Sequence, residues 1–494
     1  MRLVVLSDLH DGGAPPASGP FARIKPVHLL LRRAVRRINR FLKPDFVAVL
    51  GDLVEEGAAP DAGERYAGLR RILEELTPPW WVLPGNHDAP PEVFDRHWPR
   101  PAERIELGGA RCLPFADRFM PGHRAERAAG DLARASAAGE GWNGPVIALH
   151  HVPLFPPGAH ECPYNYVNAA EALAANARGG VSLTVAGHYH RGFGPISCPG
   201  GWTLAAPAFY EAPFRFLEIE ARAGRPPIVV EHALRMPDSL PLAESHTHTE
   251  LAYCAGDITA QGAVETCSLV GVRAPAFAEH SGQLYFDADM FWRAGFMERG
   301  VRERRGRGDR VAANRATGAA AGEPAERIGL EVDFDFEGRP VLRAADRARA
   351  GFLIGSWHWT PETAARAPFD PAVCAHRHRR VWDRMLTSGI AVLAHPFRIF
   401  HQAGIPPPRE LFMELAHRLA AAGVAAELNF HIEEPFPDFA RACLDAGVRL
   451  SLATDSHDLV EVAEFWPHLR LLRALGVADS DLDRILWRPG MDRG

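Results

Sequence analysis

The chain has 494 residues, which is too long for one ordinary hydrophobic core and predicts two or three domains. Hydrophobic residues make up 47% of the sequence and charged residues 23%, a balance that excludes an intrinsically disordered chain. The formal net charge of −6 provides no overall attraction for nucleic acid or for an anionic membrane, so neither is expected as a partner.

The cysteines and the apolar runs predict the compartment. The seven cysteines are scattered, odd in number and never in a Cys-x-x-Cys pair, which favours reduced thiols over a disulfide framework. The apolar run at the N-terminus is too short for a signal peptide, and no apolar stretch approaches the roughly 20 residues that span a bilayer. We therefore expect a soluble, cytoplasmic protein.

The first half of the chain alternates short apolar runs with polar motifs. Five runs are predicted to be buried strands: Leu3–Leu6, Phe46–Leu50, Trp80–Leu83, Val146–Leu149 and Val181–Ala186. Helical patterns lie between them, for example at Val27–Leu42 and Arg65–Leu76. Because α/β sheets build their sites at the carboxyl ends of the strands, the polar motifs are expected to meet there.

Each of these runs is followed by side chains that can bind a metal ion. The candidate ligands are Asp8, His10, Asp52, Asn86, His150, His188 and His190. Oxygen and imidazole ligands suit Mn, Fe or Zn, and this set is large enough for two divalent ions. Asp52 is the natural bridging carboxylate, and two ions about 3.5–4 Å apart can clamp a phosphate and activate water.

Two pairs of residues within these motifs are assigned separate roles. His87, beside Asn86, is predicted to be catalytic at the leaving oxygen or the phosphate, with Asp88 orienting its ring. Of His150 and His151, we expect the first, at the strand end, to be the ligand and the second to lie in the pocket wall.

The series Asp-x-His, Gly-Asp, Gly-Asn-His-Asp, His and Gly-His-x-His resembles the calcineurin-like metallophosphoesterases. The resemblance extends over residues 1–236, and His-His-Val-Pro at 150–153 is similar to the cyclic-nucleotide phosphodiesterase branch. It implies a four-layer α/β/β/α sandwich. It also implies two sets of metal ligands: Asp8, His10, Asp52 and His190 for one ion, and Asp52, Asn86, His150 and His188 for the other.

A proline-broken stretch, Leu234–Ala243, marks the expected domain boundary. Beyond it, apolar runs again precede polar residues, at Ile328–Val332, Phe352–Ile354, Ile390–Ala394 and Val448–Ala453. Repeated βα units with polar residues at the strand ends predict a barrel-like arrangement. The second set of candidate metal ligands consists of His246, His248, His280, Glu331, His358, His395, Asp455 and His457.

This second set resembles the PHP (polymerase and histidinol phosphatase) family, in its histidinol-phosphatase branch. The matching motifs are Ser-His-Thr-His-Thr (245–249), Ala-Glu-His-Ser (278–281), Gly-Leu-Glu-Val-Asp (329–333), Gly-Ser-Trp-His (355–358), Ala-His-Pro (394–396) and Thr-Asp-Ser-His (454–457). The resemblance implies a distorted (β/α)7 barrel over residues 237–494, phosphoester hydrolysis, and two or three ions. Members usually carry a third histidine shortly after His-x-His; here Cys254 or Asp257 could replace it.

Two ligand sets in one chain predict a bifunctional hydrolase of small phosphoesters. The first half would open a cyclic-nucleotide-like diester, and the second would remove the resulting monoester at a raised effective concentration. One alternative is a nuclease, which the acidic charge disfavours. Another is a single active hydrolase whose other half is a binding or scaffold module. Arg398, close after His395, is a candidate for binding the substrate phosphate.

Overall fold

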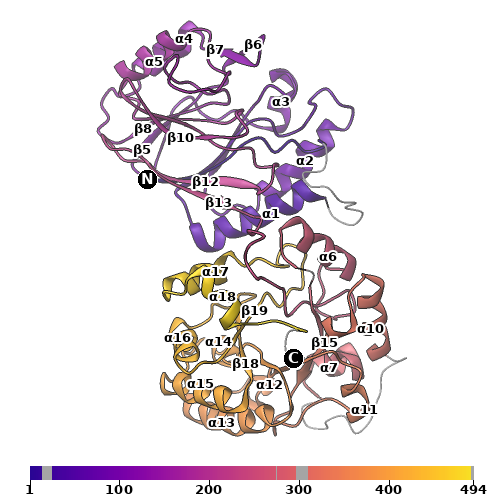
Figure 1. Cartoon of the computed structure of the whole chain (residues 1–494). Helices are drawn as coiled ribbons and strands as arrows, with labels where there is room; N and C mark the ends of the chain where they lie inside the picture. Colours follow the sequence, from indigo (N-terminus) through magenta and orange to yellow (C-terminus); the bar gives the residue numbers. More distant parts are fainter. Residues whose placement is uncertain (14–24, 274, 296–309, 491–494) are drawn as a thin grey trace. The chain divides into compact units, whose positions relative to one another are not determined.

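The computed structural model describes residues 1–13, 25–273, 275–295 and 310–490. These residues form two compact units, and the division falls between Arg235 and Met236, inside the proline-broken stretch. In Figure 1 the first unit is drawn in indigo to magenta, and the second unit ends in yellow. None of the helices in the described ranges is long and apolar enough to cross a membrane.

Two main β-sheets form the centre of the first unit. One has the order β13-β12-β1-β2-β3, and the other has the order β10-β11-β9-β8-β5-β4. Strands β1, β2 and β3 are parallel, as are β11, β9, β8 and β5. The strands are β1 (Arg2–Leu6), β2 (Phe46–Leu50), β3 (Trp80–Leu83), β4 (Ile105–Leu107), β5 (Ala110–Pro114), β8 (Val146–Leu149), β9 (Leu183–Ala186), β10 (Phe193–Cys198), β11 (Gly201–Ala205), β12 (Arg215–Glu220) and β13 (Ile228–Ala233). A separate two-stranded ribbon consists of β6 (Arg118–Met120) and β7 (Arg124–Glu126).

The main hydrophobic core of the first unit lies between these sheets. Leu3 and Val5 of β1 share one buried cluster with Ile147 of β8 and Val185 of β9. Because side chains alternate along a strand, these residues occupy the inner face of each sheet. The two sheets are therefore packed face to face.

Helices cover the outer face of each sheet. On the second sheet, Ala148 of β8 packs in a cluster with Ala135 of α4 and Ala175 of α5. On the first sheet, the outward-facing Val4 and Val47 are fully buried, and α1 and α2 are the crossovers that connect its parallel strands. The unit therefore has four layers, α/β/β/α. Its helices are α1 (Pro26–Arg37), which continues into the π-helical turn η1 (Ile38–Leu42), α2 (Ala62–Leu73), α3 (Pro91–His97), α4 (Ala129–Ser136) and α5 (Ala169–Arg178).

The second unit is built on one sheet whose strands are all parallel and follow the chain order. The strands are β14 (Phe277–His280), β15 (Ile328–Asp333), β16 (Leu353–Ser356), β17 (Val392–Leu393), β18 (Ala425–Asn429), β19 (Leu450–Ala453) and β20 (Leu486–Trp487). Single bridges join Thr247 both to Phe277 of β14 and to Ser456, just after β19. The segment around Thr247 therefore lies between β14 and the end of β19.

Helices connect the strands of this sheet. They are α6 (Ala260–Leu269), α7 (Ser281–Tyr285), α8 (Ala288–Trp292), α10 (Arg310–Ala320), α11 (Ala344–Arg347), α12 (Pro361–Ala365), α13 (Pro371–Leu386), α14 (Arg398–Gln402), α15 (Glu410–Ala422), α16 (Pro437–Asp445), α17 (Trp466–Ala474) and α18 (Leu482–Ile485), with 3-10 turns at η3 (Ala325–Arg327) and η4 (Asp479–Asp481). Every residue of β14 to β20 is buried, as expected for parallel strands covered on both faces.

The strands predicted from the apolar runs are present. They are β1, β2, β3, β8 and β9 in the first unit, and β15, β16, β17 and β19 in the second. The carboxyl ends of neighbouring parallel strands meet at one edge of a sheet. Loops that are far apart in the sequence are therefore brought together there.

A buried ion pair stabilises the region that follows β5. The guanidinium of Arg127 donates to both carboxylate oxygens of Asp117, at 3.0 and 2.9 Å, and both side chains are almost fully buried. The hydroxyl of Tyr166 donates to the same carboxylate at 2.5 Å, and the guanidinium lies 3.8 Å from the ring centroid of Phe115. Removing one partner leaves the other charge buried and uncompensated.

We expect Arg127→Met to lower the stability of the first unit by about 3–5 kcal/mol, because it leaves the Asp117 carboxylate buried without its partner. The matched control is Arg118→Met: Arg118 is exposed and lies 3.5 Å from Glu126, so this change should cost less than about 1 kcal/mol. Pulse proteolysis of the full chain in urea, with N-terminal fragments quantified by mass spectrometry, measures both. Equal unfolding midpoints for the two variants would refute this role of the pair.

Candidate metal centres

The ligand-bearing loops of the first unit depart from ordinary backbone geometry. Positive φ angles of 45–63° occur at Asp8, His10, Asp52 and His188. Such angles are uncommon outside glycine, and they persist only where the surrounding structure holds them. Here the backbone N–H of Asp8 donates to the carbonyl of Gly51 at 3.0 Å, and that of His10 donates to the carbonyl of Asp52 at 2.9 Å. The fold thus holds these side chains in a fixed arrangement.

Two motif glycines allow the loops to approach one another. A Cβ atom at Gly85 would lie 2.1 Å from Oδ1 of Asp52, and one at Gly187 would lie 1.7 Å from Oγ of Ser7. Both distances are far below van der Waals contact, so any side chain here would displace its neighbour. Glycine is required at these positions because atoms of Asp52 and Ser7 already occupy the space that a Cβ atom would take.

The first group of candidate ligands joins the loops after β1 and β9. Nε2 of His10 lies 4.0 Å from Oδ1 of Asp8 and 3.8 Å from Oδ2 of Asp52. Nε2 of His190 lies 3.7 Å from the same oxygen of Asp8. Asp8, His10 and His190 therefore offer ligand atoms that lie within 4.8 Å of one another.

Two carboxylates orient the imidazoles of this group. Glu55 accepts from Nδ1 of His10 at 2.9 Å, and Glu211 accepts from Nδ1 of His190 at 2.7 Å. Because a carboxylate only accepts, both protons lie on Nδ1, which leaves both Nε2 lone pairs near Asp8. Sequence reasoning missed both residues. Glu55 lies in the same loop as a motif and could have been found from that position, whereas Glu211 belongs to no motif.

The second group of ligands is centred on Asp52. Its Oδ2 atom lies 3.2 Å from Nε2 of His151, and Oδ1 of Asn86 lies 3.2 Å from the same nitrogen. His188 completes the group, since its ligand atom lies within 4.8 Å of those of Asp52 and His151. In the neutral His151 ring, Nδ1 donates to the carbonyl of Leu50 at 2.6 Å and Nε2 carries the lone pair. Candidate ligands from four loops therefore converge.

The structure corrects the expectation for the double histidine. His150, the predicted ligand, donates from Nδ1 to the carbonyl of Val152 at 2.6 Å, and its ring packs against Tyr166 at a centroid distance of 5.4 Å. His151 instead contacts Asp52. Successive side chains of an extended segment point in opposite directions, so only one of the two histidines can face the centre.

Buried atoms without partners test whether these residues suit a metal ion. Oδ1 of Asp8 and Nε2 of His10 are buried and have no hydrogen-bond partner within the described ranges. A buried polar atom left without a partner costs about 1–3 kcal/mol. A cation between the carboxylate oxygen and the imidazole lone pair would satisfy both. The residues present in the first ligand group therefore fit a divalent ion.

Asp88 has a different role from the one that its adjacency to His87 suggested. Nδ1 of His87 donates to the backbone carbonyl of Glu55 at 2.8 Å, so that carbonyl orients the ring. The carboxylate of Asp88 accepts from the N–H of Gly85 at 2.8 Å and from the hydroxyl of Tyr66 at 3.1 Å. Asp88 therefore fixes the loop that carries His87, and the expectation that it orients the His87 ring is corrected.

A cavity of about 320 Å³ lies against the first centre. It is lined by Asp52, His87, His123, Tyr164, His188, Tyr189, His190 and Arg191. Sequence reasoning did not select His123, Tyr164, Tyr189 or Arg191, because their spacing follows no ligand pattern. Their position beside the centre is a property of the folded chain.

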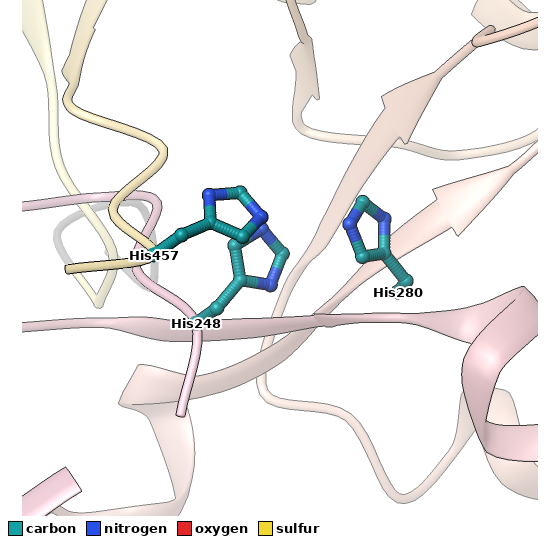
Figure 2. A group of neighbouring side chains, drawn as sticks. All are labelled: His248, His280 and His457. Carbon is teal, nitrogen blue, oxygen red and sulfur yellow. The ribbon is translucent and has the colours of Figure 1, made fainter. Parts of the chain in front are cut away.

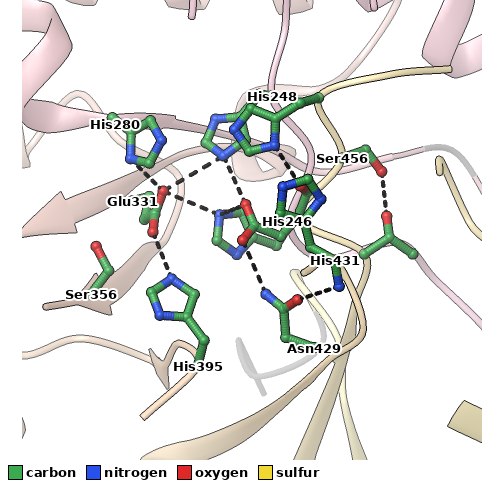
Figure 3. A network of polar contacts seen from close by, with 12 residues as sticks. His246, His248, His280, Glu331, Ser356, His395, Asn429, His431 and Ser456 are labelled. Atoms are coloured by element: carbon green, nitrogen blue, oxygen red, sulfur yellow. Dashed lines mark hydrogen bonds and ion pairs between the residues drawn. The ribbon is translucent and has the colours of Figure 1, made fainter. Parts of the chain in front are cut away.

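Glu331 is the central carboxylate of the second unit (Figure 3). Five imidazoles lie around it, those of His246, His248, His280, His358 and His395. Its Oε2 atom lies 2.7–3.6 Å from a nitrogen of each of the first three, and Oε1 lies 3.1–3.2 Å from Nε2 of the last two. One fully buried carboxylate thus separates two groups of imidazoles.

Asp455 adds a second carboxylate to one of these groups. Its Oδ1 atom lies 3.1 Å from Nε2 of His248 and 3.6 Å from Nε2 of His246. Together with Glu331, these residues place four ligand atoms within 4.8 Å of one another. Nε2 of His246 is buried without a hydrogen-bond partner among the residues described, and a cation in this group would satisfy it.

Three imidazoles form a further group (Figure 2). His248 lies before β14, His280 ends β14, and His457 follows β19, yet their ligand atoms lie within 4.8 Å of one another. Nδ1 of His457 donates to the carbonyl of Asp455 at 2.7 Å, which leaves its Nε2 as an acceptor. All eight predicted ligands of the second unit are therefore gathered around one centre.

Carboxylates that the motifs did not identify as ligands orient two of these imidazoles. Glu427 at the middle of β18 accepts from Nδ1 of His246 at 2.9 Å, and Asp333 at the end of β15 accepts from Nδ1 of His358 at 2.9 Å. Such outer contacts fix the tautomer of a metal-binding histidine. Asp333 ends a matched motif and could have been found, but nothing near Glu427 in the sequence marks it.

Arg398 does not have the role expected from its position in the sequence. Its guanidinium is buried and donates to Oδ2 of Asp455 at 2.7 Å. Asn429 donates to the same oxygen at 3.1 Å. These two donors hold Oδ2, so Oδ1 of Asp455 is left to face the imidazoles. The expectation that Arg398 binds substrate phosphate is therefore replaced by a positioning role.

Cys254 and Asp257, the two residues that could replace the third histidine, each contact another part of the second unit. Sγ of Cys254 accepts from Nε2 of Gln283 at 3.3 Å, and burial raises the pKa of the Cys254 thiol to about 12. Oδ1 of Asp257 accepts from the backbone N–H of Leu459 at 2.8 Å. Cys254 is therefore held as a thiol, and Asp257 supports the loop after β19.

The pKa values show two classes of ligand. Burial opposes charge on His151, but Asp52 raises the pKa of His151 to about 9. Burial would raise the pKa of Glu331, but the surrounding imidazoles lower it well below its usual range. By contrast, burial lowers the pKa of His188 and that of His457 to about 3. The carboxylates thus favour positive charge beside them, while the neutral imidazoles carry the lone pairs that a metal ion needs.

Comparison with known proteins bears on the first unit. The family model of the calcineurin-like phosphoesterases matches residues 1–192. Among solved structures, a dimetal phosphatase from Danio rerio aligns with a TM-score of 0.38 and 13% identity, covering 47% of this chain and 99% of that chain. Purple acid phosphatase PPD1 from yellow lupin (Lupinus luteus) seeds aligns with a TM-score of 0.33 and 14% identity, covering 47% of this chain and 51% of that chain. The chain thus spans about half of the lupin protein. A comparison with curated proteins finds no match.

The matched residues include every candidate ligand of the first centre. Residues 1–192 therefore carry a calcineurin-like metallophosphoesterase domain, and the protein is a metal-dependent phosphoester hydrolase.

Loss of a residue that only orients a metal ligand typically costs about 10- to 100-fold in metal affinity. We expect His151→Ala, which removes a candidate ligand itself, to weaken metal binding at the first centre by more than this. His150→Ala is the matched neighbour and should keep its metal, because His150 faces Tyr166. Metal content per chain, measured by mass spectrometry after dialysis, separates the two. Metal loss in His150→Ala together with retention in His151→Ala would reverse the assignment.

We expect Glu331→Gln to remove metal from the second centre, because the neutral amide replaces the carboxylate around which five imidazoles gather. Glu337→Gln is the control, since the carboxylate of Glu337 is exposed and pairs with Arg380 at 3.3 Å. Metal content should fall further in the double variant with Asp52→Asn, which also impairs the first centre. If Glu331→Gln binds as much metal as Glu337→Gln, the second cluster is not a metal centre.

Proposed function

We propose that this chain is a bifunctional phosphoester hydrolase with one metal centre in each unit. The first unit hydrolyses a small, cyclic-nucleotide-like phosphodiester. The second unit is a PHP domain of the histidinol-phosphatase type and removes the phosphomonoester that results. The observation that carries this proposal is that each unit gathers its own set of imidazoles around a buried carboxylate, Asp52 in one and Glu331 in the other.

The residues of the first centre divide the work of diester hydrolysis. One divalent ion would be held by Asp8, His10, Asp52 and His190, and a second by Asp52, Asn86, His151 and His188. Bound there, the two ions would supply Lewis-acid polarisation of phosphate oxygens and activation of water. Since Nδ1 of His87 is held by the carbonyl of Glu55, its Nε2 remains free to exchange a proton with the leaving oxygen. His87 also lines the cavity in which the substrate would lie.

The second unit is a distorted (β/α)7 barrel in this proposal. Parallel strands β14 to β19 follow the chain order, and the segment around Thr247 bridges both β14 and the end of β19, which supports closure of the row. Two ions would be held on the two sides of Glu331. A third would lie among His248, His280 and His457. Arg398 and Asn429 hold Asp455 in place for this arrangement.

The test is a coupled assay on the full chain. With Mn²⁺ present, cyclic nucleotides and other small diesters should yield inorganic phosphate through a monoester. Asp52→Asn should stop diester cleavage, because it removes the carboxylate shared by both ligand groups of the first centre. His246→Ala should leave diester cleavage intact and let the monoester accumulate. Diester cleavage that survives Asp52→Asn would overturn this division of labour.

The same assay separates the other functions that the sequence allowed. Digestion of single-stranded and double-stranded oligonucleotides at rates above those for small diesters would indicate a nuclease. Full phosphate release that is unaffected by His246→Ala would indicate one active hydrolase and a second unit with a binding role.

A further inference from the structure

The cavity of the first unit has a wall that the metal chemistry does not require. Asp52, His87, His188 and His190 account for one side of the cavity of about 320 Å³. The remaining lining residues are His123, Tyr164, Tyr189 and Arg191, which come from the β6–β7 turn, the loop before α5 and the loop after β9. Three of these four side chains are aromatic rings.

The rings form a connected group beside a ligand. The ring centroid of Tyr164 lies 4.6 Å from that of His188, 5.8 Å from that of His123 and 6.4 Å from that of Tyr189. Tyr164 is only half-buried, and His123 is exposed, so both present ring surface to the cavity. Ring surface that is open to a cavity is available to a planar group of the substrate.

The position of His123 is held by its backbone. His123 adopts a φ of 57°, in the left-handed region, at the turn between β6 and β7. Its carbonyl accepts from Nε2 of the ligand His188 at 3.1 Å. This contact ties the β6–β7 turn to the candidate metal centre, so the backbone that carries the His123 ring is held beside the cavity.

Arg191 gives the same wall a positive charge. It is exposed, directly follows the ligand His190, and makes no ion pair with any residue that the structure describes. A guanidinium in this position can contact the phosphate oxygens of any phosphoester bound at the centre.

We propose that Tyr164 and His123 form a stacking platform that selects phosphodiesters carrying a nucleobase, while Arg191 contacts the phosphate that all diesters share. This inference rests on the proposed diesterase activity of the first unit and names the residues that select the base of its nucleoside phosphodiester substrate. Tyr164 and His123 are specificity-determining residues: they contact the base and take no part in the chemistry.

Two substrates that share one leaving group isolate this selectivity. Thymidine 5′-(p-nitrophenyl phosphate) and methyl p-nitrophenyl phosphate both react with water, which forms a new P–O bond as the bond to p-nitrophenolate breaks. They leave thymidine 5′-monophosphate and methyl phosphate. Only the first carries a base, so a difference between them in KM reports on the platform.

We expect Tyr164→Leu in the full chain to raise KM for the thymidine diester by about 5- to 150-fold, the range for loss of one base–aromatic stack, with little change for the methyl diester. Tyr164→Phe is the matched control and should keep the wild-type selectivity, because it retains the ring. Arg191→Met should lower kcat/KM for both substrates alike. A parallel loss on both substrates in Tyr164→Leu would assign Tyr164 a structural role and overturn the inference.

A binding measurement separates failure of this inference from failure of the proposed reaction. Calorimetry with thymidine 5′-monophosphate should show weaker binding to Tyr164→Leu than to wild type or Tyr164→Phe, whether or not the chain turns over either diester. If wild type cleaves neither diester but binding still depends on the Tyr164 ring, the platform stands and the proposed reaction is wrong. Binding that is equal in all three proteins refutes the platform.

Discussion

A carboxylate that is removed from water is costly unless charge and hydrogen bonds compensate it, and both candidate metal centres are organised around this constraint. Asp52 and Glu331 are almost fully buried, and each lies between two groups of ligands. Glu331 uses its two oxygens separately, with three imidazoles near Oε2 and two near Oε1. A divalent ion in each group would compensate the buried charge, and the imidazoles provide the lone pairs to hold it.

Gathering so many ligands requires loops to converge, and parallel strands provide the means. In both units most of the candidate ligands lie within or just after strands that run side by side, so residues distant in sequence meet at one edge. Convergence also imposes strain: Asp52 in the first unit and Asp455 in the second each have a φ of 50°. Glycine relieves the crowding where backbone must pass beside a ligand, as Gly85 does beside Asp52.

The imidazoles are prepared for metal by partners on their other nitrogen. In the first unit these partners are carboxylates such as Glu55 and backbone carbonyls such as that of Leu50. In the second unit they include Glu427 and Asp333. Each contact places a proton on one nitrogen and leaves the other as a ligand. The two units differ in sheet topology, yet in both the imidazole tautomers are fixed beside a buried carboxylate.

The substrate side of the first centre depends on different residues. His123 and Tyr164 belong to none of the ligand motifs, but the contact between the His123 carbonyl and the ring of His188 joins the β6–β7 turn to the centre. Metal binding and the shape of the cavity are therefore linked through one imidazole. Changes in this turn would alter both the orientation of a ligand and the wall that a substrate meets.

The sequence by itself determined nine of the strands and the motifs that supply the candidate ligands, because apolar runs and motif spacing record local structure directly. It could not decide between His150 and His151, because a rotation of the chain at the end of β8 selects which ring faces Asp52. It also could not assign Asp88 to the loop backbone, Arg398 to Asp455, or Glu427 to His246. These contacts join separate strands and loops, so only the tertiary structure decides them.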